Sequence, residues 1–195
     1  MAGQVATRAR RIFDELKGLA LTLGLMLLAG TAIGQPFIVP SGSMEPTLMI
    51  GDEIAAAKYA YGYGRYSSPV GTIPLKGRIL EQPPERGDIA VFALPRDPSQ
   101  TYVKRLIGLP GDVVSERDGF VYINGAQLQE PYIKAGRRDH EPPRTWARIP
   151  KGYYFFMGDN RSASCDSRVW GPVPRANLIG EVFFVYWPPT RIGFR

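Results

Sequence analysis

No charged side chain occurs between residues 18 and 39, although Asp, Glu, Lys and Arg make up 22% of the chain. A helix of this length is about what a bilayer requires, so we expect residues 18–38 to be a transmembrane helix and residues 1–17 a cytoplasmic segment. A cleaved secretory signal is the alternative, with a cleavage site near residues 30–32. Under both interpretations the remaining chain lies outside the cytoplasm, because flanking positive residues favour the cytoplasmic side. These residues are Arg8, Arg10, Arg11 and Lys17.

The rest of the sequence is typical of β structure. It contains many of the 18 prolines, and a helical period is hard to find beyond the N-terminal apolar run. Apolar strand-like segments occur at residues 100–109, 153–157 and 180–187, and Asn124-Gly125 favours the type I′ turn of a hairpin. We therefore expect a mainly β fold, with an antiparallel sheet or partly open barrel as its core and a small β-rich insertion.

The β region divides by composition. We expect residues 39–112 and 153–195 to form the main domain. Residues 113–152 would form the insertion, since residues 132–150 are polar, basic and rich in proline. Residues 58–80 are rich in Gly and Tyr and have little periodicity, so we expect a long surface loop that rests on the membrane interface.

Composition excludes several classes of site. The chain has one histidine, His140, and one cysteine, Cys165, so neither a Cys/His zinc site nor an intramolecular disulfide can form. A Ser-His-Asp triad would need His140, which lies in a polar loop and is better interpreted as a surface residue. The net charge of +6 comes from scattered residues without a basic run. This favours anionic lipid over nucleic acid as a partner.

A candidate nucleophile follows the apolar run, in the segment Ser-Gly-Ser-Met-Glu-Pro-Thr-Leu at residues 41–48. Gly42 allows a sharp turn before Ser43, and Pro46 fixes φ three residues later. Such a turn can present a hydroxyl and leave backbone N–H groups free to bind an oxyanion. The alternative is a simple loop that links the anchor to the domain. The local sequence leaves both interpretations open.

A serine nucleophile needs a base, and Lys104 is the best candidate. On a strand, Tyr102, Lys104 and Leu106 share one face while Arg105 points to the other. Apolar surroundings disfavour the charged amine and so lower the pKa of a lysine. The alternative is a strand lysine whose amine reaches water. Four other lysines lie in looser, more polar contexts: Lys58, Lys76, Lys134 and Lys151.

Taken together, these segments resemble the bacterial type I signal peptidases. This family, also called leader peptidases, comprises membrane-anchored Ser-Lys peptidases that remove signal peptides from exported preproteins. The matching segments are the apolar run and residues 41–52, 86–92, 102–112 and 157–168. The resemblance covers most of the chain and favours an uncleaved anchor.

The resemblance implies a role for each matching residue. Ser43 would be the nucleophile and Lys104 the general base. The Ser41 hydroxyl would donate to the oxyanion beside the Ser43 amide, and Ser164 would orient the lysine. Two ion pairs would support the site, Asp159 with Arg105 and Asp166 with Arg168. After residue 161 this chain has Ser162-Ala163-Ser164-Cys165, where relatives are often more polar. Either Ser162 or Cys165 could therefore replace Ser164 in the lysine contact.

The resemblance also implies a substrate and a location. The substrate would be an extended signal peptide with small residues at the first and third positions before the cut, held in shallow apolar pockets. Membrane lipid would be the second partner, and neither metal nor cofactor is needed. The protein would span the bacterial inner membrane once, with its main domain on the periplasmic side. Candidate pocket residues are Phe37, Val39, Pro40, Met44, Leu48, Ile54, Val91 and Tyr102.

Two other functions remain open. A narrower Ser-Lys peptidase, such as one that matures a single pilin, would use the same residues. A membrane-anchored β domain could instead bind peptides without cleaving them.

Overall fold

The computed structural model describes residues 13–25, 34–66 and 77–195. Residues 13–25 are helical. Within the described part, no helix is both long enough and apolar enough to span a membrane. Of the expected anchor, residues 26–33 lie outside the described residues. The expected C-terminal end of the anchor at residue 38 is wrong, because Gly34–Ile38 form strand β1. This strand pairs with β2 (Glu53–Ala57). Gly34 and Pro36 both disfavour a helix, which explains the early change to strand.

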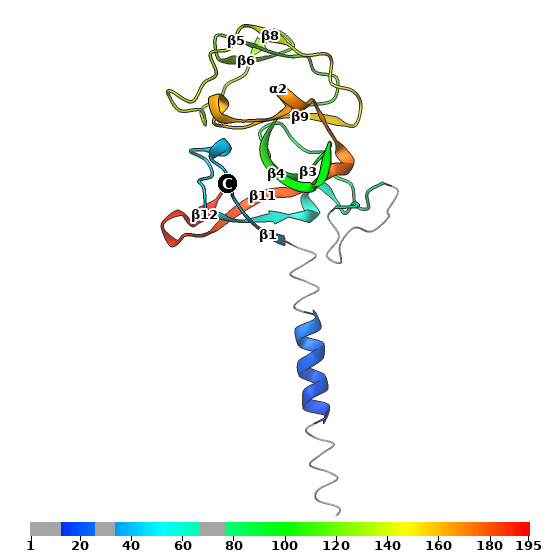
Figure 1. Ribbon diagram of the computed structural model, residues 1–195. Coiled ribbons are helices and arrows are strands. Elements are labelled where there is room, and N and C mark those ends of the chain that lie inside the picture. Colours follow the sequence, from blue (N-terminus) through cyan, green and yellow to red (C-terminus); the bar gives the residue numbers. More distant parts are fainter. Residues whose placement is uncertain (1–12, 26–33, 67–76) are drawn as a thin grey trace, which may run out of the picture.

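One antiparallel sheet dominates the molecule (Figure 1). Its strands follow the order β1-β2-β11-β3-β4-β9-β10, and β12 pairs with β11. The mainly β, antiparallel prediction is confirmed. The pairing path of the described residues ends at β1 and β10, so the partly open barrel stays a prediction. The further strands are β3 (Ile89–Leu94), β4 (Asp97–Gly108), β9 (Tyr153–Met157), β10 (Val173–Pro174), β11 (Leu178–Trp187) and β12 (Gly193–Phe194).

A second sheet, in the order β7-β6-β5-β8, lies within the expected insertion and above β9 in Figure 1. Asn124 and Gly125 both have positive φ, at 52° and 86°, as a type I′ turn requires. They join β6 to β7 in an antiparallel hairpin, as the sequence predicts. A second turn, at Asp118-Gly119, joins β5 to β6. The strands are β5 (Val114–Arg117), β6 (Phe120–Ile123), β7 (Ala126–Gln127) and β8 (Arg144–Thr145).

The remaining elements are short. They are the 3₁₀ helices η1 (Gly42–Met44), η2 (Lys58–Tyr61), η3 (Arg161–Ala163), η4 (Arg175–Asn177) and η5 (Pro189–Arg191), and the helix α2 (Ser167–Trp170).

Strand β9 is buried on both faces, which explains its continuous apolar sequence. Tyr154 and Phe156 pack into a cluster with β3 and β11, while Phe155 and Met157 pack into a cluster with β5 and β6. Burying a side chain of this size stabilises the fold by about 1.5–3 kcal/mol. The insertion therefore shares a core with the main sheet and is held against β4 and β9.

The expected surface loop at residues 58–80 needs correction where it is described. Lys58 and Tyr61 of η2 are buried, although the sequence suggested polar surroundings for Lys58. The Tyr61 hydroxyl donates a hydrogen bond to Asp88 at 3.1 Å, and the Arg78 guanidinium donates to the carbonyl of Gly62. Helix η2 contacts β11, and the Arg78 guanidinium also donates to the Leu178 carbonyl of β11 at 2.9 Å, so both described ends of the segment lie on the sheet. Residues 67–76 lie outside the described residues.

Candidate active site

The 3₁₀ helix η1 carries Ser43 between β1 and β2. Ser43 is buried, and its backbone is held from two sides by Asn160. The Asn160 N–H donates to the Ser43 carbonyl at 3.0 Å, and the Asn160 Nδ2 donates to the Gly42 carbonyl at 3.0 Å. The sequence indicated the turn but gave no role to Asn160. The position of this turn therefore depends on a loop more than 100 residues away in the sequence.

Lys104 reaches the same point from the middle of β4. Its Nζ lies 2.6 Å from Ser43 Oγ and 3.1 Å from the Val103 carbonyl oxygen. Lys104 is only 3% exposed, and Tyr102 and Leu106 of the same strand face pack in the core. The amine and the hydroxyl are therefore in hydrogen-bond contact inside the protein.

Burial has a direct electrostatic consequence for this amine. It lowers the pKa of Lys104 from 10.5 to about 8, because the charged form loses its hydration. The negative charges of Asp166 and Asp159 oppose this shift. A lysine with such a pKa is partly neutral near pH 8 and can accept a proton from a hydroxyl.

A second hydroxyl lies beside the first. Ser41 Oγ is 3.3 Å from Ser43 Oγ, and Ser41 precedes η1 in an extended conformation. The first N–H groups of a helix have no partner within it. The Ser41 hydroxyl and the Ser43 amide are thus two hydrogen-bond donors close to Ser43 Oγ.

Ser164 lies close to the pair without joining it. Lys104 Nζ makes hydrogen bonds to Ser43 and Val103, and among the described residues the buried Ser164 Oγ has no hydrogen-bond partner. A Cβ at Gly158 would lie 2.3 Å from Ser164 Oγ and 2.4 Å from the Ser43 carbonyl oxygen. Only glycine at position 158 permits this close approach. Cys165 is exposed.

Arg105 and Asp159 form a bidentate ion pair on the face of β4 opposite to Lys104. The Arg105 Nε and Nη2 donate to the two Asp159 oxygens at 2.8 and 2.7 Å. Asp159 is fully buried, and the Thr47 hydroxyl also donates to it. Tyr132 covers the guanidinium, with its ring centroid 4.0 Å away. The pair therefore connects β4 to the turn after Ser43.

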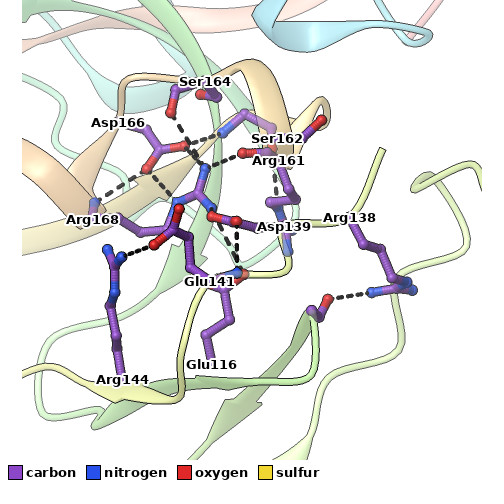
Figure 2. A network of polar contacts seen from close by, with 12 residues as sticks. Glu116, Arg138, Asp139, Glu141, Arg144, Arg161, Ser162, Ser164, Asp166 and Arg168 are labelled. Carbon is purple, nitrogen blue, oxygen red and sulfur yellow. Dashed lines mark hydrogen bonds and ion pairs between the residues drawn. The ribbon is translucent and has the colours of Figure 1, made fainter. Parts of the chain in front are cut away.

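The second ion pair belongs to a buried network that Figure 2 shows from close by. Arg168 Nε donates to Asp166 at 2.9 Å, and Arg168 Nη1 donates to Asp139 at 2.7 Å. The other Asp166 oxygen accepts from the Gly158 N–H at 3.0 Å. Arg161 pairs with the buried Glu130 of the insertion. Neither Arg161 nor Glu130 was predicted as a site residue, and an Arg in the 157–168 segment is the only signal that could have pointed to this pair.

A groove of about 430 Å³ opens beside the Ser-Lys contact. Five of the eight predicted pocket residues line it, namely Phe37, Pro40, Ile54, Val91 and Tyr102. The other three, Val39, Met44 and Leu48, do not line it and are corrected; they lie in the buried core, where Met44 is the last residue of η1. An apolar residue next to a groove cannot be distinguished by sequence from one that lines it. The groove is also lined by Ile38, Ser41, Gln100, Thr101, Val103 and Lys104.

Comparisons with known proteins identify a family for this chain. Residues 12–187 match the family model described as signal peptidase, peptidase S26. The chain belongs to this family. Signal peptidase I of Rickettsia typhi is 38% identical over 94% of this chain and 83% of that protein. The Pseudomonas aeruginosa signal peptidase I is 35% identical over 88% of this chain and 72% of its own length.

A solved structure is also similar in sequence. The crystal structure of a signal peptidase I from Enterococcus faecalis shares 38% identity with this chain. It covers 51% of this chain and 97% of that one, with a TM-score of 0.46. The family match identifies this S26 protein as a serine peptidase and therefore a hydrolase.

Proposed function

We propose that this S26 peptidase cleaves signal peptides from exported preproteins with a Ser43–Lys104 dyad. The observation that carries the proposal is the 2.6 Å contact between the Ser43 hydroxyl and a buried amine. Burial also lowers the pKa of Lys104, which favours the neutral amine that a base requires. The chain's similarity to proteins named signal peptidase I supports the choice of substrate.

The proposed reaction is acyl transfer in two halves. Neutral Lys104 takes the proton of Ser43 while Oγ attacks the scissile carbonyl, and the Ser41 hydroxyl and the Ser43 amide bind the oxyanion. Protonated Lys104 then gives its proton to the leaving amine, and an acyl-enzyme remains. Water attacks this ester with Lys104 as base again, and Ser43 leaves with its proton restored. The Val103 carbonyl, 3.1 Å from Lys104 Nζ, would hold the amine in line for both halves, and the two ion pairs would support the site.

The groove would bind the residues before the scissile bond. Strand β1 ends the pairing path of the main sheet, so an extended peptide could pair along it and place alternate side chains in the groove. The aliphatic and aromatic walls, including Ile54 and Tyr102, favour small side chains at the first and third positions before the cut. A larger side chain would clash with these walls.

The membrane part of the proposal rests on sequence. The uncharged run that begins at residue 18 would anchor the protein in the bacterial inner membrane, with residues 1–17 in the cytoplasm. Because β1 takes residues 34–38, the anchor would end near residue 33. The main domain, residues 39–112 and 153–195, and the insertion, residues 113–152, would lie on the periplasmic side.

The direct test incubates the purified full-length protein with a preprotein and identifies the products by mass spectrometry. We expect a cut after a small residue at the end of the signal peptide, and no product from Ser43→Ala. Cleavage that persists in Ser43→Ala would refute the nucleophile. A narrower peptidase would process one preprotein of a panel instead of many, and intact substrate throughout would indicate the binding-domain alternative.

A further inference from the structure

One ion pair ties the turn that carries Ser43 to the insertion. Glu45 Oε2 lies 3.0 Å from Arg137 Nη2, in the segment that follows β7. The Glu45 side chain folds back over η1. Its Oε1 lies so close to Gly42 that a Cβ on that residue would be only 2.9 Å away. The Glu45 carboxylate therefore reaches from the C-terminal end of η1 back to Gly42, the residue before Ser43.

Arg137 is itself fixed to the loop that supports the site. Its carbonyl accepts a hydrogen bond from the Ser162 N–H at 3.2 Å. Ser162 lies two residues after Asn160, which holds the carbonyls on both sides of the nucleophile. Asp139, two residues after Arg137, pairs with Arg168 at 2.7 Å (Figure 2). Residues 137–139 thus meet the nucleophile turn, the supporting loop and the buried network at once.

The nucleophile turn depends on such outside contacts. Helix η1 has only three residues, and its N-cap, Ser41, makes no side-chain capping bond. A single 3₁₀ turn has little stability of its own. A small displacement of a nucleophile from its base lowers the rate strongly, because the reacting atoms must already be aligned. Contacts from elsewhere in the fold must therefore keep Ser43 Oγ within hydrogen-bond distance of Lys104 Nζ.

We propose that Glu45 and Arg137 are positioning residues that hold the nucleophile turn against residues 137–139 and so keep Ser43 aligned with Lys104. The proposal rests on the role proposed for Ser43 and goes beyond it by giving the insertion a part in the reaction. The two side chains act through Ser43 and do not touch the reacting bond. Their loss should lower kcat and leave KM unchanged.

The test compares full-length variants in preprotein cleavage. Glu45→Gln and Arg137→Gln should each lower kcat about five-fold, the size expected for a partly exposed ion pair. The double variant should be no slower than either single variant, because the two residues act as one unit. Arg137→Lys keeps the charge and should recover most of kcat. The matched control is Glu141→Gln, which breaks the exposed Arg144–Glu141 pair (2.6 Å) of the same insertion and should change nothing.

Several results would overturn the inference. An unchanged kcat in Glu45→Gln would do so, as would a change confined to KM, which would indicate a substrate contact. A double variant that multiplies the two single losses would show that the residues act separately. Thermal unfolding of each variant shows whether a lower kcat comes only from a smaller folded fraction. A loss of activity explained in this way would also contradict the positioning role. Failure of the Ser43 assignment would look different, since Ser43→Ala would then remain active.

Discussion

Two lysines are withdrawn from water in this protein, and they differ in what lies beside them. Lys104 on β4 is 3% exposed and Lys58 on η2 is 2% exposed. Burial lowers the pKa of both amines. Lys104 has a serine hydroxyl at 2.6 Å. For Lys58, residues 13–25, 34–66 and 77–195 provide neither a hydrogen bond nor an ion pair to the amine. Burial thus makes a lysine easier to deprotonate, and the neighbouring hydroxyl is what gives the neutral amine a reaction.

The surroundings of the two amines differ in charge as well. Asp166 and Asp159 act on Lys104 and limit the fall of its pKa, whereas for Lys58 the described residues contribute only desolvation. Lys104 also lines the groove, while η2, which carries Lys58, contacts β11 and β1. A general base must reach the reacting groups, take a proton from the nucleophile and release it again at the pH of the cell. Only the surroundings of Lys104 meet these requirements.

Removing each amine gives the largest contrast. We expect Lys104→Ala to lower kcat/KM for preprotein cleavage about 10³-fold or more, because a general base is lost. Lys58→Ala should leave kcat/KM within about two-fold of the parent protein, since no reacting group lies near it. The measurement is the initial rate of product formation with one preprotein.

Circular dichroism of both variants supplies the control for folding. A folded Lys104→Ala protein that keeps full activity would contradict the dyad. A large loss in folded Lys58→Ala would show that the contrast between the two lysines is wrong.

The difference between these lysines marks what could be predicted from the sequence. Alternation along residues 102–106 was enough to place Lys104 among apolar neighbours and Arg105 on the other face. Lys58 was placed in a polar loop because its segment has no periodicity, and its burial depends on the packing of η2 against β11. Periodicity describes regular elements, so it gives no information on a short irregular turn that tertiary contacts cover.

The same limit applies around the site. The resemblance gave positions for Ser43 and for the two ion pairs, because each lies in a short matching segment. Contacts from Asn160 to the nucleophile turn, and from Arg137 to Glu45, join segments more than 90 residues apart. No local pattern encodes such a distance. The core position of Met44, in contrast to the groove position of Phe37, also follows from the tertiary direction of the side chain.

A stability measurement would sharpen the contrast further. Lys104→Met removes a buried charge and keeps most of the volume, so we expect it to raise the free energy of unfolding at pH 6 by on the order of 2 kcal/mol. The folded-state pKa lies below the unfolded value. The cost of the charge is therefore fully present below pH 8 and disappears as the pH rises from about 8 to 10.5.

Urea unfolding at pH 6 and at pH 10 measures this gain. It should shrink at the higher pH, and Lys58→Met should follow the same direction because burial also lowers the pKa of that lysine. A gain that is equal at both pH values would mean that the buried charge is not its source.

The pH dependence of cleavage should be about ten-fold per pH unit below the pKa of Lys104. Only the neutral amine can take the Ser43 proton, and the pKa of Lys104 is about 8. We therefore expect kcat/KM to rise about ten-fold from pH 6 to 7, to rise further through pH 8, and to level off above about pH 9. Lys58→Met should have the same midpoint as the parent protein, because its amine takes no part. A flat profile from pH 6 to 9 would show that cleavage does not depend on the protonation of Lys104. A midpoint that moves in Lys58→Met would show that the titrating group is not Lys104 alone.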